Sequence, residues 1–330
     1  MRRGVLVAAG VLICFACKRG AKEVVVYTSV DQPFSEPIFK EFEKRSGMKV
    51  LAVYDTEETK STGVVNRLIA EARQPQADVF LSGDPVRPFL LIKRGLVQPY
   101  PSPAAATVPA RFRAPDGTWT GSAARARILL VNKQKVSAAE MPKSVRDLAA
   151  PRWKGQTALA NPLFGTTTMH VAALFGAWGE DKGRAFLDDL KTNQARIASS
   201  NGEVKRLVTA GEVAFGLCDT DDAAEALHDG APVEVVYPDQ DGVGTLVMPT
   251  AVVLMKGPHP DAGQALVDWL VSAEVDKRMA ELAAHMPLRA DIQVPGVRSA
   301  SSFRSMQVDY ARLGDEMERI QPWLRQWVGL

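Results

Sequence analysis

The sequence predicts an α/β fold divided into two lobes. With 330 residues, the chain is too long for one small core and suggests two units of ordinary size. Short apolar runs alternate strictly with segments whose apolar residues recur at helical spacing, which is typical of parallel sheets flanked by helices. The apolar runs are continuous rather than alternating, so we expect strands that are buried on both faces.

Three strand–helix pairs are expected in the first hundred residues. The valine-rich run EVVVYTS opens the series and predicts a buried strand. The expected strands are 23–29, 48–54 and 77–83. The expected helices are 37–47, 63–74 and 86–95. The segment 95–119 that follows carries five prolines and predicts a linker or surface loop.

A second α/β unit is expected in the middle of the chain, and it opens with a long strand at 124–136. The further strands expected are 156–162, 213–219 and 233–238. The further helices expected are 144–155, 166–179, 183–193, 203–211 and 223–230. A long apolar stretch at 244–257, a helix at 260–282 and an amphipathic helix at 302–327 complete the chain.

Composition excludes several classes of function. Hydrophobic residues make up 46% of the chain and charged residues 24%, as in a soluble globular protein, and the net charge is only +2. There is no long basic block, so no nucleic-acid partner is expected. The sequence contains no G-x-S-x-G, no Walker A loop and no G-x-G-x-x-G after a strand. We therefore expect a binding protein rather than an enzyme.

The N-terminus predicts export from the cytoplasm. Two arginines precede an apolar run at 5–16, which is too short to span a membrane and has the length of a signal-peptide core. The run ends in Ala16-Cys17, which resembles the lipobox of bacterial lipoproteins. We expect residues 1–17 to be a signal peptide with a lipobox and Cys17 to be the lipidation site, with secretion without lipidation as the alternative. Cys218 is expected to be a small buried hydrophobe.

Several segments, taken in order, resemble a known family. They are VVVYTSVDQ, ADVFLSGDP followed by LLIKRGLVQPY, WKGQTALANP, GEVAFGLCDTDD and HPDAGQALVDWLVSAEVDKRMAE. The chain resembles the periplasmic solute-binding proteins of ABC importers, in particular the ferric-ion-binding branch. The resemblance implies a type II periplasmic-binding-protein fold, with ligand held between two lobes. Lobe 1 would comprise 23–123 and 244–300, lobe 2 would comprise 124–243, and 301–330 would form a C-terminal helix.

Polar side chains follow the predicted strands at the ends where open α/β sheets bind ligands. The candidates for ligand binding are Tyr27, Ser29, Ser82, Gly165, Thr166, Thr167, Asn201 and Asp219. The segment 165–168 is also a natural anion seat, because a helix N-terminus offers free N–H groups. Each candidate has an alternative role as a helix cap. Convergence of several such loops favours a binding site.

The resemblance also implies a metal site, although the expected residue types are replaced. Where the ferric branch carries a histidine and a tyrosine pair, this chain has Asp31 and Asp221-Asp222; Asp84 is the nearest carboxylate to a further position. The metal candidates are therefore Asp31, Asp84, Asp221 and Asp222. Crowded carboxylates disfavour full ionisation, and a hard cation such as Fe³⁺, Ca²⁺, Mg²⁺ or Mn²⁺ would relieve that.

We therefore expect a periplasmic component of an ABC transporter, lipid-anchored and monomeric, that delivers its ligand to a membrane permease and its ATPase. The expected ligand is ferric iron or another hard metal ion, with an accompanying anion on 165–167 and no resident cofactor. Two alternatives remain: a binder of an organic anion such as a phosphonate or carboxylate, and a ligand sensor for a membrane receptor.

Overall fold

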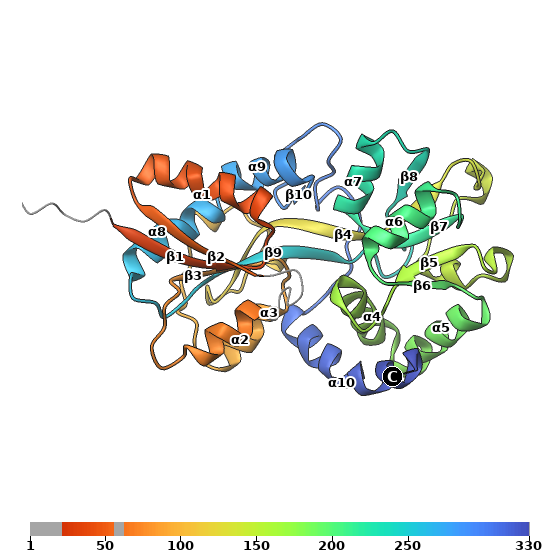
Figure 1. The fold of residues 1–330 in the computed structure, drawn as a ribbon, viewed down its shortest axis with the longest axis horizontal. Helices are drawn as coiled ribbons and strands as arrows, with labels where there is room; N and C mark the ends of the chain where they lie inside the picture. Colours follow the sequence, from red (N-terminus) through yellow and green to blue (C-terminus); the bar gives the residue numbers. More distant parts are fainter. Residues whose placement is uncertain (1–21, 56–62, 330) are drawn as a thin grey trace, which may run out of the picture.

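Two lobes lie side by side in the computed structural model, which describes residues 22–55 and 63–329. Figure 1 shows them joined by two long strands, β4 (Thr120–Asn132) and β9 (Val247–Leu254). This arrangement confirms the predicted two-lobed α/β fold, and β4 and β9 are the strands that cross between the lobes. The predicted signal peptide and Cys17 lie outside the described residues.

Lobe 1 is built on three neighbouring strands. In it, β1 (Glu23–Thr28) pairs in parallel with both β2 (Lys49–Tyr54) and β3 (Val79–Ser82). All four residues of β3 are buried, as the continuous apolar run predicts. The helices of this lobe are α1 (Gln32–Ser46), α2 (Gly63–Ala70), α3 (Arg87–Lys93), α8 (Pro260–Leu270) and α9 (Ala273–Ala283).

Lobe 2 repeats the parallel arrangement. Here β5 (Thr157–Ala160) pairs in parallel with β6 (Arg196–Ala198) and with β7 (Phe215–Asp219). A short strand, β8 (Val233–Val236), pairs antiparallel with β4. The helices of this lobe are α4 (Gly165–Trp178), α5 (Glu180–Thr192), α6 (Asn201–Thr209) and α7 (Thr220–His228).

The crossing strand β4 connects the two sheets. The hydrogen-bonded strand order is β2-β1-β3-β9-β4-β7-β5-β6, and β10 (Met286–Pro287) and β8 also pair with β4. All partners of β4 run antiparallel to it. The predicted boundary between lobe 1 and lobe 2, at 123/124, falls inside β4. A single strand thus belongs to both lobes, and the predicted domain limits stay a prediction.

Several predicted helices differ from the structure in their limits or type, and three cases show the physical reason. The first helix begins at Gln32 instead of residue 37, because Gln32-Pro33 already forms a first turn and Pro37 is accommodated inside the helix. The predicted helix at 260–282 is two helices, since Ser272 caps a new one through a hydrogen bond from the N–H of Val275. The segment 144–155 forms 3₁₀ turns at Val145–Ala149 and Pro151–Trp153 rather than an α-helix.

The C-terminal helix α10 (Tyr310–Val328) packs against both lobes. It begins eight residues later than the predicted 302, where Asp309 caps its first turn. Its buried face includes Leu324, which is 0% exposed, and its Trp323 ring lies 5.7 Å from that of Phe175 in α4. On the other side, Asp315 pairs with Lys93 of α3.

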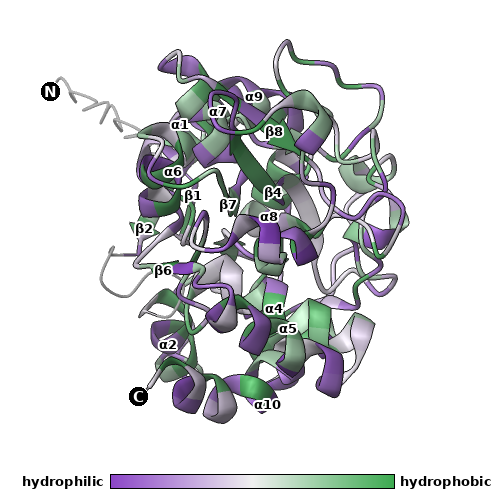
Figure 2. Ribbon diagram, turned by 90° about the vertical axis from the view of Figure 1, so that its right-hand side faces the viewer, coloured by the Kyte–Doolittle hydropathy of each residue, from purple (hydrophilic) through white to green (hydrophobic). Residues whose placement is uncertain are grey.

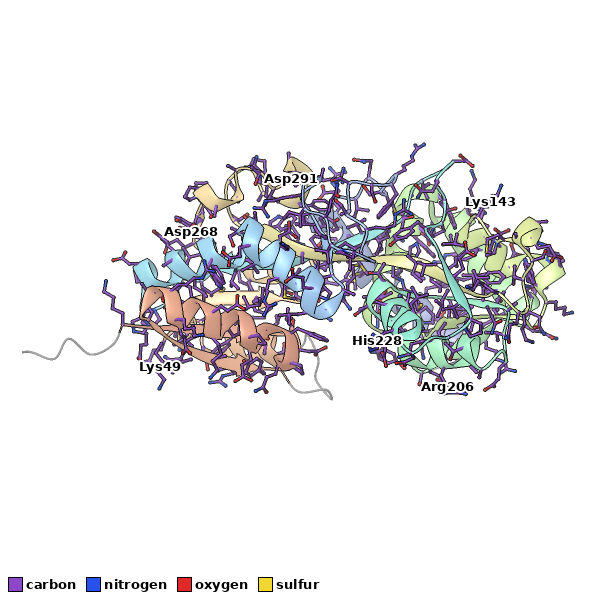
Figure 3. All side chains as sticks on the ribbon, turned by 90° about the horizontal axis from the view of Figure 1, so that it is seen from above. Lys49, Lys143, Arg206, His228, Asp268 and Asp291 are labelled. Atoms are coloured by element: carbon purple, nitrogen blue, oxygen red, sulfur yellow. The ribbon has the colours of Figure 1, made fainter. Side chains whose placement is uncertain are left out.

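Apolar residues lie in the sheets and polar residues lie on the outside. Figure 2 shows β4 in the hydrophobic colour near the middle of the molecule, and hydrophilic segments on the peripheral helices. Figure 3 shows Lys49, Lys143 and Arg206 near the outer edges of the molecule, and His228, the last residue of α7, is exposed as well. In the described part of the chain, no helix has both the length and the apolar character needed to cross a membrane.

Candidate functional site between the lobes

The central feature of the site is a buried arginine on the crossing strand. Register between β4 and β7 places Arg127 opposite Asp219. Arg127 is 0% exposed and Asp219 is 2% exposed, and Arg127 Nη1 donates to Asp219 Oδ1 at 2.6 Å. A buried charge needs such a partner, because removing it from water is costly. The pair therefore fixes the end of β7 against the crossing strand.

Three predicted ligand-binding residues complete this network. Arg127 Nη1 also donates to the hydroxyl of Thr166 at 3.0 Å and to the amide oxygen of Asn201 at 3.1 Å. Its Nη2 donates to the hydroxyl of Thr167 at 3.1 Å. The hydroxyl of Thr166 donates in turn to Asp219 Oδ2 at 2.9 Å. The first turn of α4, the first residue of α6 and the end of β7 thus meet around one guanidinium.

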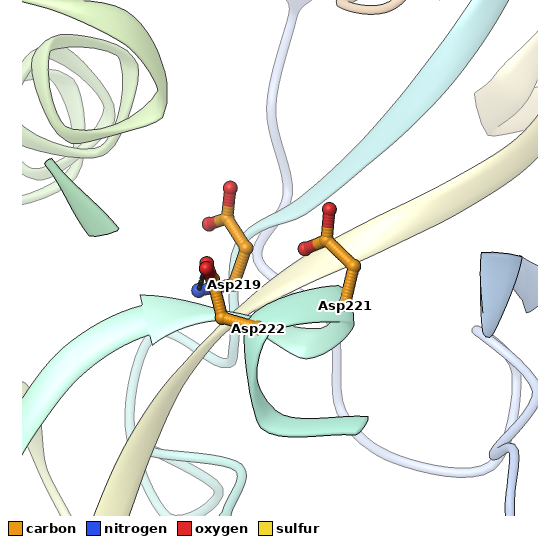
Figure 4. Close-up of side chains that lie close together, drawn as sticks. All are labelled: Asp219, Asp221 and Asp222. Atoms are coloured by element: carbon orange, nitrogen blue, oxygen red, sulfur yellow. Dashed lines mark hydrogen bonds between the residues drawn. The ribbon is translucent and has the colours of Figure 1, made fainter. Parts of the chain in front are cut away.

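Three carboxylates lie close together where β7 ends and α7 begins. Oxygens of Asp219, Asp221 and Asp222 all lie within 4.8 Å of one another. Figure 4 shows the Asp219 and Asp221 carboxylates pointing the same way, while Asp222 accepts a hydrogen bond from the N–H of Asp219 at 3.3 Å. Asp222 therefore caps its helix as well as joining the cluster. The stretch FGLCDTDD places these residue types together because a strand end and a helix start share one turn.

Crowding has an electrostatic consequence for Asp222. Burial, together with the nearby carboxylates of Asp221 and Asp219, raises its pKa from 3.8 to about 7. The carboxyl group of Asp222 therefore keeps its proton to higher pH than an ordinary aspartate does. The raised pKa of Asp222 agrees with the expectation that full ionisation of the crowded carboxylates is unfavourable.

A second arginine links the cluster to lobe 1. Arg125 Nη1 lies 3.5 Å from carboxylate oxygens of both Asp219 and Asp221, and its Nη2 donates to the carbonyl of Gly83 at 3.0 Å. Burial opposes its charge, but the surrounding carboxylates, led by Asp221, outweigh that effect and raise the pKa of Arg125. Asp84 is one of those carboxylates. The side chain of Arg125 therefore spans the two lobes.

The loop after β3 is held firmly against the loop after β1. The hydroxyl of Ser29 accepts from the N–H of Gly83 at 2.9 Å, and that of Ser82 accepts from the N–H of Asp84 at 3.4 Å. Asp84 Oδ1 accepts from the N–H groups of Val86 at 2.9 Å and Arg87 at 3.0 Å. The capping alternative thus holds for Asp84, whose charge still acts on Arg125.

The last predicted metal candidate, Asp31, immediately precedes α1 as its N-cap residue. Its charge acts on His285, as do the charges of Arg125 and Asp219. Asp31 of lobe 1 and Asp219 of lobe 2 therefore both influence one imidazole. The charge of Asp84, also in lobe 1, acts on Arg125 in the same way.

One predicted ligand-binding residue is not brought to this site by the structure. The hydroxyl of Tyr27 donates to Glu71 Oε2 at 2.9 Å, beyond the end of α2. The guanidinium of Arg67 lies over its ring, 4.8 Å from the centroid. Because side chains alternate along a strand, Tyr27 and its neighbour Thr28 point to opposite faces of β1. The site role of Tyr27 stays a prediction that this geometry does not support.

Sequence reasoning missed Arg125, Arg127 and His285. The two arginines occupy alternate positions in ARARILLVN, and such residues share one face of a strand. An arginine pair inside an otherwise apolar run was the available signal, because buried arginines need partners. For His285 the sequence offers no comparable signal, since it lies in the short segment between α9 and β10.

A small cavity of about 120 Å³ lies in lobe 1, away from this site, and is lined in part by Glu71 and Lys256.

Comparison with known proteins agrees with this architecture. A family model described as bacterial extracellular solute-binding protein matches residues 74–312. The chain is 28% identical to iron uptake protein A1 of Synechocystis, over 88% of this chain and 82% of that protein. It is 24% identical to a putative 2-aminoethylphosphonate-binding periplasmic protein of Salmonella paratyphi A, over 93% and 88% of the two chains.

A solved structure is similar as well. The ferric iron-binding protein A of Mannheimia haemolytica, in an open conformation, superposes with a TM-score of 0.80 at 25% identity, covering 93% of this chain and 99% of that one. The chain belongs to the family of bacterial extracellular solute-binding proteins. Its fold is the type II periplasmic-binding-protein fold.

Proposed function

We propose that this protein is the periplasmic solute-binding component of an ABC importer, and that its ligand is a hard metal ion, ferric iron foremost. The observation that supports the metal is the cluster of Asp219, Asp221 and Asp222, with oxygens within 4.8 Å of one another. The similarity to an iron uptake protein and to a ferric iron-binding protein supports the choice of iron. Carboxylate oxygens are suitable donors for such an ion.

Charge balance favours a cation over an anion at the cluster. Four carboxylates act on Arg125, namely those of Asp221, Asp219, Asp222 and Asp84. Arg125 and Arg127 together supply two positive charges, so four negative charges minus two leaves an excess of two when all four acids are ionised. A cation bound beside Asp221 and Asp222 would offset that excess and would lower the pKa of Asp222, which burial and then the neighbouring carboxylates raise.

An accompanying anion is proposed at the start of α4. The residue before this helix, Phe164, provides no side-chain cap within the described chain. The first N–H groups of any helix lack intrahelical acceptors, and the helix dipole favours negative charge there. Gly165 is exposed, while Thr166 and Thr167 already bind Arg127. The backbone N–H groups, rather than the threonine hydroxyls, would therefore hold the anion.

Lobe closure and delivery complete the proposal. Solute-binding proteins of this fold close by hinge motion when ligand contacts both lobes, and the crossing strands β4 and β9 are the hinge candidates here. The protein would then dock on a membrane permease, whose ATPase supplies the energy. Lipid anchoring through Cys17 and a monomeric state belong to the same proposal.

The metal content of the purified protein, combined with calorimetry, tests this function. We expect ferric iron, supplied as its citrate complex, to bind the wild-type protein and to bind Asp221→Asn/Asp222→Asn at least about tenfold more weakly. Glu225→Gln, on the exposed face of the same helix, is the matched control and should bind as the wild type does. Equal binding by the double variant would overturn the metal assignment.

The same titration decides between the cation and an organic anion. If 2-aminoethylphosphonate binds without any metal, and the double variant retains that binding, the ligand is an anion and the acidic residues only cap α7. If neither class binds, the protein is not a carrier of these ligands, and sensing of another molecule becomes the working hypothesis.

A further inference from the structure

The second half of α10 is fixed to lobe 2 by aromatic contacts. The ring centroid of Trp323 lies 5.7 Å from that of Phe175 in α4 and 4.6 Å from the guanidinium of Arg184 in α5. Trp327 is 6% exposed, and its Nε1 donates to Asp188 Oδ1 of α5 at 3.1 Å. Buried aromatic side chains contribute strongly to packing. This half of the helix should therefore move with lobe 2 as one rigid body.

The first residue of α10 lies on the crossing strands. Tyr310 is 6% exposed, and its hydroxyl donates to the carbonyl of Val247 at 2.9 Å. Val247 is the first residue of β9, where it is opposite Ala126 of β4. The Tyr310 ring also meets Trp119 edge-on, just before β4, with the ring centroids 5.8 Å apart. Because β4 and β9 are the hinge candidates, this end of the helix should be displaced little when the lobes rotate.

The contact of α10 with lobe 1, between these two anchors, is light by comparison. Asp315 pairs with Lys93 of α3, but their side chains are 60% and 52% exposed, and exposed ion pairs contribute little. Gly314 lies against Val86, the residue before α3: a Cβ atom at Gly314 would be 3.1 Å from Val86 Cγ1. A glycine presents no side chain that could interlock with the neighbouring element. These contacts therefore allow the helix to shift over α3 at small energetic cost.

We propose that α10 is a strap that is carried by lobe 2 and slides over α3 when the lobes close. In Figure 1, the helix runs along one side of the molecule, from beside α3 to beside α4 and α5. Its 19 residues span roughly 28 Å, so rotation of lobe 2 about the crossing strands carries the middle of the helix across α3. This inference rests on the proposed function, which supplies lobe closure, and it identifies a contact that closure has to break.

The strap has a consequence for ligand binding. If α10 is held against α3, lobe 2 cannot rotate, and the ligand can bind only the open form. The ligand then loses the contacts that both lobes make in the closed form, so its apparent affinity falls. Holding α10 against lobe 2 instead should change nothing, because the helix and lobe 2 already move together.

The same helix offers a matched control on the side of lobe 2. Arg319, one turn after Asp315, pairs with Glu180 of α5 at 2.5 Å between Nη1 and Oε2, and the two side chains are 46% and 40% exposed. The two ion pairs are therefore alike in chemistry and exposure. They differ in that Lys93–Asp315 joins α10 to lobe 1, whereas Arg319–Glu180 joins α10 to lobe 2.

Crosslinking at the two pairs tests the proposal. The variants are Lys93→Cys/Asp315→Cys and Glu180→Cys/Arg319→Cys, each closed with a short bismaleimide, and the cysteines at positions 14 and 17 are replaced by serine in every protein compared. The remaining cysteine, Cys218, is 0% exposed, so the reagent should react with the introduced thiols. The variants without crosslinker report any effect of the substitutions themselves.

Small-angle X-ray scattering and calorimetry give the two readouts, with ferric citrate as the ligand. We expect the radius of gyration to fall on ligand binding in the wild type, in both variants without crosslinker and in the crosslinked 180–319 protein. The crosslinked 93–315 protein should not contract and should bind at least about tenfold more weakly. Contraction of the crosslinked 93–315 protein, or loss of contraction in both crosslinked proteins, would overturn the proposal.

A second ligand keeps this test separate from that of the proposed function. Failure of the wild type to bind ferric citrate in the calorimeter contradicts the proposed metal ligand, and the same scattering comparison is then made with 2-aminoethylphosphonate. If the wild type contracts with neither ligand, the strap is overturned too, because it requires lobe closure.

Discussion

Arg127 and Asp219 form an ion pair, 2.6 Å between Nη1 and Oδ1, that is almost wholly removed from solvent. The pair ties the crossing strand β4 to the turn that carries the acidic cluster. The guanidinium of Arg127 also donates hydrogen bonds to the side chains of Thr166, Thr167 and Asn201. The acidic cluster is thus fixed to the crossing strand β4.

Removing the charge of Arg127 should destabilise the protein strongly. Arg127→Met leaves Asp219 buried without its main partner, so we expect a loss of about 3–5 kcal/mol in the free energy of unfolding. Arg196→Met breaks an exposed pair with Glu212 at 3.0 Å and should cost at most about 1 kcal/mol. Urea denaturation measures both, and comparable losses would contradict the structural role of the buried pair.

The stability of the metal-free protein should depend on pH through Asp222. Its folded pKa of about 7 lies above its ordinary value of 3.8, so its contribution is fully present below pH 4 and is lost as pH rises through 7. Asp222→Asn mimics the protonated form and removes this dependence. We expect the stability of the variant relative to the wild type to increase from pH 5 to pH 8, measured by urea denaturation with a chelator present. Parallel pH profiles would be the contrary result, and Glu225→Gln is the control.

A methyl group added at Gly216 should disturb β7 just before the site. A Cβ atom there would lie 2.4 Å from Cγ1 of Val204 and 3.0 Å from the carbonyl oxygen of Ala158. Gly216→Ala should therefore cost about 1–3 kcal/mol through overpacking. Gly176→Ala in α4 meets nothing within 4 Å and should be neutral or stabilising by up to about 1 kcal/mol. Thermal denaturation of the two variants distinguishes these outcomes.

The C-terminal helix should be held by its apolar face rather than by its ion pairs. Leu324 is 0% exposed, so Leu324→Ala should cost about 2–5 kcal/mol. Asp315 pairs with Lys93 of lobe 1, but their side chains are 60% and 52% exposed, so Asp315→Ala should cost less than about 1 kcal/mol. A larger effect of Asp315→Ala in chemical denaturation would show that the exposed bridge is a principal connection between α10 and lobe 1.

Local sequence patterns predicted most of the fold and part of the site. The apolar runs located the strands, because burial on both faces leaves a signature within a few residues. Helix limits were less accurate where capping decided them, as at Ser272 and Asp309. The loop candidates Thr166, Asn201 and Asp219 do converge, because residues after parallel strands meet at one edge of a sheet.

The sequence by itself determined an α/β protein with acidic and hydroxyl groups at its strand ends, since residue types and short-range periodicity are local properties. Only the tertiary structure decided which of these groups meet. Register between β4 and β7 joined Arg127 to Asp219, and Arg125 on the same strand reached both Asp221 and the carbonyl of Gly83. Tyr27 was turned toward Glu71 instead. Register between distant strands depends on packing across the whole molecule, which no single segment encodes.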